Sequence, residues 1–117
     1  MTIHRRIGFA AGLAGALGVV TLAIGAHAVT GANLDVAGQI LLIHAAALLA
    51  LAIADDLRGR GLAALLIVVG CLLFSGDLAW RALTARHLFP MAAPTGGFTL
   101  IIGWLVVAIG ALASRDR

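Results

Sequence analysis

Four long apolar segments, separated by short polar stretches, organise the chain. They cover residues 7–29, 36–54, 61–83 and 96–113. A helix needs about 17–25 predominantly apolar residues to cross the hydrocarbon core of a bilayer, and each segment falls within that range. The pattern predicts one all-α domain over residues 1–117, an integral membrane four-helix bundle.

Composition supports this class. Of the 117 residues, 62% are hydrophobic and 11% are charged, whereas soluble domains carry about 25% charged residues. A soluble chain of this length could not hide so much apolar surface, because small domains keep a large surface for their volume. Membrane lipid is therefore the expected surrounding of most side chains.

The first segment has one alternative interpretation. Arg5 and Arg6, an apolar run and then Ala26-His27-Ala28 imitate a signal peptide with its cleavage site. The apolar part of a signal peptide is about 7–15 residues long, and this run is longer. We therefore interpret it as the first transmembrane helix.

Arginine positions predict the orientation, since short cytoplasmic loops are enriched in basic residues. Six arginines fall at the N-terminus, in the second loop and in the tail: Arg5, Arg6, Arg58, Arg60, Arg115 and Arg117. Only Arg81 and Arg86 lie near the opposite side. We expect both termini in the cytoplasm (N-in/C-in).

Small residues favour close helix packing in the first segment. Gly8, Gly12, Gly15 and Gly18 recur along it, and small residues let helix backbones approach closely in lipid. Packing within the chain is the favoured interpretation. The alternative is a homodimer face, so a homo-oligomer or a larger membrane complex is an open expectation.

Polar residues inside the apolar segments are the candidate site, because ionisable groups in a membrane are costly and often mark function. Asp77 and Arg81 are four residues apart and can pair on one helix face. With the predicted topology, five residues fall at one depth in the outer half of the bundle: His27, Gln39, His44, Asp77 and Arg81.

The residue types of this predicted cluster suit more than one chemistry. His27 and His44 lie on different segments without a metal-ligand spacing such as HxxxH, so a metal or haem site is disfavoured. A proton or quinone site is reasonable because histidine titrates near neutral pH. The alternative, which we favour, is that these groups form hydrogen bonds and ion pairs between helices.

Other function classes are excluded or disfavoured. The arginines lie in pairs at segment ends rather than in one basic patch, which argues against nucleic-acid binding. No nucleophile–base spacing indicates an enzyme, no cofactor is predicted, and the single Cys71 excludes an internal disulfide. We predict a small structural or accessory membrane protein. The alternative is binding or transport of a small molecule, lipid, quinone or proton through the predicted cluster.

Four short motifs resemble those of one family. They are Gly25-Ala26-His27-Ala28, His44-Ala45-Ala46-Ala47-Leu48-Leu49, Phe74-Ser75-Gly76, and Pro94-Thr95-Gly96-Gly97 followed by Gly103-Trp104. Their order and spacing are similar to those of the domain of unknown function 423 family, related to transmembrane protein 256. The resemblance implies four transmembrane helices in a bacterial inner membrane. Family members usually carry serine and tyrosine where this chain has Asp77 and Ala79.

Overall fold

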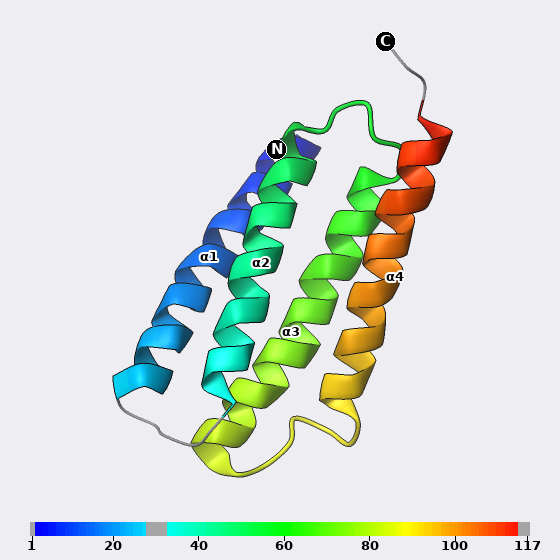
Figure 1. The fold of residues 1–117 in the computed structure, drawn as a ribbon. Helices are drawn as coiled ribbons and strands as arrows, with labels where there is room; N and C mark the ends of the chain where they lie inside the picture. Colours follow the sequence, from blue (N-terminus) through cyan, green and yellow to red (C-terminus); the bar gives the residue numbers. More distant parts are fainter. Residues whose placement is uncertain (1, 28–32, 115–117) are drawn as a thin grey trace.

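Four antiparallel helices lie side by side in the computed structural model, which describes residues 2–27 and 33–114 (Figure 1). They are α1 (Ile3–His27), α2 (Leu34–Ile53), α3 (Arg60–Thr84) and α4 (Ala92–Ala113). The described residues contain no strand. All four helices are long and apolar enough to cross a membrane, so the predicted all-α membrane class is confirmed.

Helix ends differ from the predicted bounds by a few residues. Residues 28 and 29, assigned to the first span, lie outside the described residues. Helix α4 begins at Ala92, four residues before the predicted position, and includes Pro94. A proline is tolerated in the first turn because the N–H groups there have no partner within the helix. Asn33 is the N-cap of α2.

The bundle consists of two helical hairpins, α1–α2 and α3–α4, that meet along α2 and α3. A pair of glycines lies at the crossing in each hairpin. A Cβ atom built on Gly38 would lie 3.0 Å from the Gly18 carbonyl oxygen, and one on Gly70 would lie 3.0 Å from the Gly96 oxygen. Larger residues would force the backbones apart, so these glycines set the spacing within each hairpin.

The four glycines predicted at a close contact divide into two groups. Gly18 faces the α2 backbone, and a Cβ on Gly15 would lie 3.7 Å from the Ala45 side chain. No atom lies within 4 Å of a Cβ built on Gly8 or Gly12. Of these four glycines, Gly18 therefore makes the closest contact with α2, whereas Gly8 and Gly12 have open space beside them.

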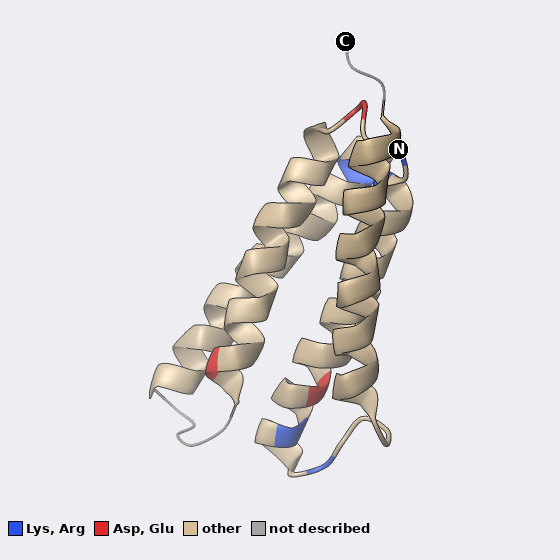
Figure 2. Cartoon of the chain, turned by 45° about the vertical axis from the view of Figure 1, so that its right-hand side comes forward, with Lys and Arg blue, Asp and Glu red and all other residues tan. Residues whose placement is uncertain are grey.

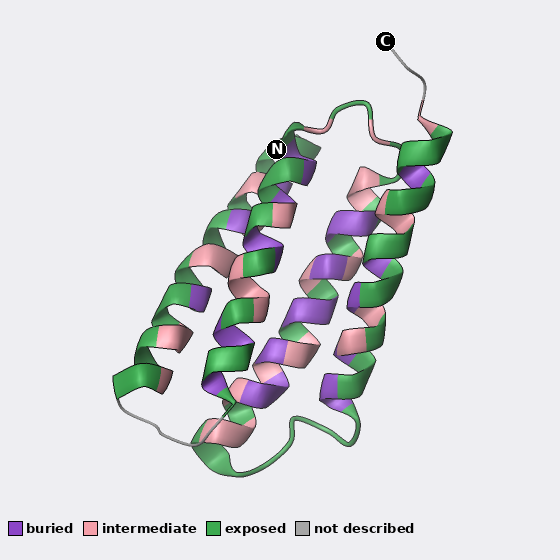
Figure 3. Cartoon of the chain, viewed as in Figure 1, coloured by how far each residue is buried: buried purple, intermediate pink, exposed green. Residues whose placement is uncertain are grey.

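Buried side chains line the inner faces of the helices, and large apolar ones cover the outside (Figure 3). Leu48 and Ile67 are at most 1% exposed, whereas Leu112 is 89% exposed and Ile53 is 79% exposed. An apolar exterior of this extent indicates lipid rather than water as the surrounding solvent.

Charged residues gather toward the two ends of the bundle (Figure 2). At the end where α1 begins, the Arg60 guanidinium donates to the carbonyl oxygens of Leu51 and Ala52 and pairs with Asp55 at 3.0 Å. The Leu51 carbonyl oxygen also accepts from the Ala54 backbone N–H, so Arg60 adds a second donor there and supplies one to Ala52 in the last turn of α2.

Candidate functional site

Asp77 is the polar centre of the opposite end of the bundle. Its side chain is fully buried although it carries a carboxylate. The Leu88 backbone N–H donates to Oδ1 at 2.8 Å, and His87 Nδ1 donates to Oδ2 at 3.2 Å. Both donors come from the connection between α3 and α4, so one carboxylate ties this connection to the last turns of α3.

The connection between α3 and α4 reaches Asp77 because the chain reverses sharply at both ends of this connection. Ala85 ends α3 with φ +60°, and its N–H donates to the Arg81 carbonyl oxygen at 2.8 Å. Met91 has φ +68° and is the N-cap of α4. Left-handed backbone of this kind is uncommon for residues other than glycine.

Arg81 completes this site. Its Nε lies 3.7 Å from Asp77 Oδ2, which is an ion-pair distance but too long for a hydrogen bond. The Nε atom is buried and has no hydrogen-bond partner among the described residues, while the side chain as a whole is 36% exposed. The predicted pairing of Asp77 with Arg81 is thus present as a contact between charges.

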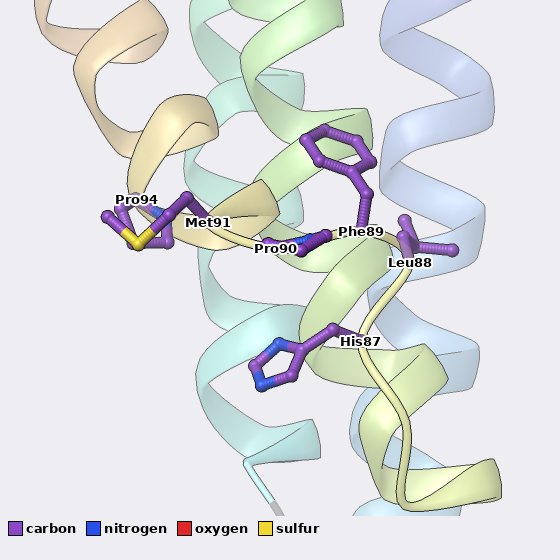
Figure 4. A pocket seen from close by; sticks show the side chains of 6 residues that line it. All are labelled: His87, Leu88, Phe89, Pro90, Met91 and Pro94. Atoms are coloured by element: carbon purple, nitrogen blue, oxygen red, sulfur yellow. The ribbon is translucent and has the colours of Figure 1, made fainter.

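An open cavity of about 530 Å³ lies along the same connection. Figure 4 shows the side chains that line it, which are His87, Leu88, Phe89, Pro90, Met91 and Pro94. The lining is mainly apolar, with His87 as its titratable group. Asp77 lies beyond it, in contact with His87.

A second polar contact links the two hairpins. Trp104 on α4 donates its indole N–H to His44 Nε2 on α2 at 3.0 Å, and the two rings lie 5.8 Å apart. The other ring nitrogen of His44 lies 2.7 Å from the Ile40 carbonyl oxygen. An indole can only donate, so Nε2 accepts and the proton of the histidine is on Nδ1.

A third contact lies between α3 and α2. Ser75 is 2% exposed, and its hydroxyl donates to the Ala37 carbonyl oxygen at 3.0 Å. Burying a polar group is costly unless it forms a hydrogen bond. Ser75 and His44 therefore have partners where water could not supply them.

The structure does not gather the five predicted residues into one site. Among them, only Asp77 and Arg81 contact each other through polar atoms. His44 contacts Trp104 instead, and His27 and Gln39 are exposed on α1 and α2. At about 1.5 Å per residue, the five residues spread over about 15 Å of depth, because His44 lies at the middle of α2.

Three partners were not among the predicted residues: His87, Trp104 and Ser75. His87 and Ser75 carried no local signal, because their partners are set by the chain reversal and by helix packing. Trp104 could have been found by depth, since it is the thirteenth residue of α4 and His44 the eleventh of the parallel α2. An indole N–H in the middle of a membrane needs an acceptor.

The polar contacts of His44 and Asp77 join separate parts of the chain. Within residues 2–27 and 33–114, no three histidine, cysteine or acidic side chains converge in a way that could hold a metal ion. The contacts of His44 and Asp77 are separate, and each joins two parts of the chain that are distant in sequence.

Four membrane-length helices, an apolar exterior and charges toward both ends define a multi-pass membrane protein. Its family follows from comparison with known proteins. The profile of the family described as "Protein of unknown function (DUF423)" matches residues 10–97. The chain belongs to this family, which confirms the resemblance of its motifs.

Curated relatives agree with this assignment. The chain is 33% identical over 86 residues to a UPF0382 membrane protein of Haemophilus influenzae, covering 71% of this chain and 68% of the relative. UPF0382 membrane proteins from two strains of Staphylococcus epidermidis are 43% identical over 47 residues, covering 40% of this chain and 38% of each relative. No solved structure matches the chain significantly.

Proposed function

We propose that this protein is a small structural or accessory component of the bacterial inner (cytoplasmic) membrane and that it catalyses no reaction. The observation that carries the proposal is the use of its buried polar side chains. His44, Ser75 and Asp77 each form hydrogen bonds with another part of the same chain. These contacts hold the helices and the α3–α4 connection together.

A transport or catalytic site makes a different demand on such groups. Polar residues of ion and proton pathways face a cavity that contains water, where they can exchange partners. Here both oxygens of Asp77 and both ring nitrogens of His44 already have partners in the protein. Because these groups already form hydrogen bonds within the protein, they support an accessory role, in a homo-oligomer or in a larger membrane complex.

The proposal includes an orientation with both termini in the cytoplasm. Helix α1 begins and α4 ends at the same end of the bundle (Figure 1). Arg5, Arg6, Arg58 and Arg60 lie at this end, whereas Arg81 and Arg86 lie at the other. The excess of arginine supports a cytoplasmic position by the positive-inside rule.

The alternative function is binding or transport of a small molecule, lipid, quinone or proton at the outer end. One observation favours it. The side chain of His87 is 55% exposed, lines the 530 Å³ cavity and contacts the buried Asp77. A proton could therefore reach the carboxylate through the imidazole.

A pair of measurements on one preparation separates the two functions. We would extract the protein with its native lipids in polymer discs, run native electrophoresis and identify the co-migrating subunits by mass spectrometry. The accessory role predicts companion subunits in fixed ratio, and the variant Asp77→Asn should co-migrate with them.

The second measurement is proton flux into liposomes containing the purified protein. A protein that migrates alone and carries a flux abolished by Asp77→Asn would contradict the accessory role.

A further inference from the structure

A groove runs between α1 and α3 from the end where α1 begins to the middle of the bundle. Two cavities, of about 300 Å³ and 240 Å³, follow one another along it and share Ala10, Leu48 and Val68. The two walls are α1 and α3, which make only sparse direct contact. The floor is Leu48 of α2, which is 1% exposed.

The length of the groove matches one lipid leaflet. Along α1 its lining extends from Ile3 to Leu17, and the part from Arg6 to Leu17 is about 16 Å long at about 1.5 Å per residue. Half of the hydrocarbon core of a bilayer is about 15 Å. The inner cavity, lined by side chains such as Leu13, Cys71 and Leu72, is entirely apolar. An acyl chain that enters at Arg6 would therefore end near the bilayer midplane.

The mouth of the groove is cationic. Arg6 lines it and is exposed, and in the described part of the chain it forms no ion pair. Asp55, which follows α2 at the same end of the bundle, is paired with Arg60. Basic pockets between transmembrane helices bind the head groups of anionic lipids. An apolar helix of a second copy would fit this mouth poorly, because it would have to cover the guanidinium without a partner.

We propose that this groove binds one anionic phospholipid from the leaflet at the N-terminal end of the bundle. Its phosphate contacts Arg6, and one acyl chain lies along Ala10, Leu48 and Val68. The site is separate from Asp77 and goes beyond the proposed accessory role, because an accessory protein without a lipid preference would satisfy that role equally well.

Native mass spectrometry of protein offered equal amounts of phosphatidylglycerol and phosphatidylethanolamine with identical acyl chains tests this site. The wild type should retain one phosphatidylglycerol in preference. Arg6→Gln should lower its retention about fivefold, as expected for the loss of one charge near an anionic head group. Arg5→Gln is the matched control, because Arg5 is adjacent and exposed but does not line the groove. It should retain the lipid as the wild type does.

A second pair of variants tests the acyl chain. Ala10→Leu should fill the groove and reduce retention, whereas Ala16→Leu, on an exposed position of α1, should not. Equal retention of the two lipids, or equal losses in Arg5→Gln and Arg6→Gln, would overturn the proposal. So would a dimer that Ala10→Leu dissociates while lipid retention stays unchanged, because the groove would then hold a second chain.

Discussion

Asp77 shows how one buried carboxylate organises its surroundings. It accepts from a backbone N–H eleven residues away and from His87, and it contacts the charge of Arg81. Removing one member of a buried polar group is costly because the remaining members lose their partners. The carboxylate should therefore matter more for stability than its position near the end of a helix suggests.

Replacing Asp77 with alanine should lower the free energy of unfolding by about 2–3 kcal/mol, because Leu88 N–H and Arg81 lose their partner. Asp77→Asn should cost about half as much, since its amide oxygen still accepts from Leu88. Unfolding in mixed micelles measures both. Asp35→Ala is the control, because Asp35 is exposed in the first turn of α2 and should cost less than about 1 kcal/mol. Equal losses of unfolding free energy in Asp77→Ala and Asp35→Ala would show that the contacts of Asp77 do not stabilise the protein.

Contacts between residues close in sequence were predictable, whereas contacts across the fold also depended on chain reversals and on which helices are neighbours. The Asp77–Arg81 pair follows from a four-residue spacing on one helix. His87 reaches Asp77 only because Ala85 and Met91 adopt left-handed backbone, which no spacing indicates. Trp104 meets His44 across 60 residues, and that pairing depends on which helices are neighbours.

The existence of the four helices could be predicted from hydropathy. Where each helix ends, and which of its faces packs against another helix, could be seen only in the structure. The predicted fourth segment began at residue 96, after Pro94, although the first turn of a helix accepts proline. Among the glycines, composition indicated close packing but not which face carries it. The contacts depend on the partner helix: Gly18 of α1 lies against Gly38 of α2, and Gly70 of α3 lies against Gly96 of α4.

Two glycine substitutions compare a crossing with an open face. Gly96→Ala should destabilise the protein by about 1–3 kcal/mol through overpacking against α3. Gly12→Ala should instead be neutral or stabilising by up to about 1 kcal/mol, because alanine favours a helix and no atom lies within 4 Å. Thermal unfolding in detergent distinguishes them. Equal effects would contradict the hairpin packing, and loss of a dimer in Gly12→Ala would assign Gly12 to an interface between copies.

At the scale of the whole molecule, α1 begins and α4 ends at the same end of the bundle (Figure 1), and the arginines predict which side of the membrane this end faces. Reporter fusions at either terminus should show a cytoplasmic location. Fusions in the connection between α3 and α4 should show the opposite side. A periplasmic signal from either terminus would contradict the proposed orientation while leaving the four-helix fold intact.

In the part of the chain that the structure describes, few polar contacts join the two hairpins, and the bond from Trp104 to His44 joins α4 to α2. These helices make little backbone contact with each other, so the side chains themselves bridge the space between them. Such bonds within membranes contribute about 0.6 kcal/mol on average and up to about 1.7 kcal/mol. We infer that the buried polar groups of this protein form stabilising hydrogen bonds of this kind between its parts.

A double-mutant cycle on His44→Phe and Trp104→Phe, followed by unfolding in mixed micelles, tests this claim most directly. We predict a coupling of about 0.6–1.7 kcal/mol between the two positions. The double variant should therefore lose less stability than the sum of the single variants. Losses that add within about 0.3 kcal/mol would show that the two side chains act independently, and that result would contradict the account.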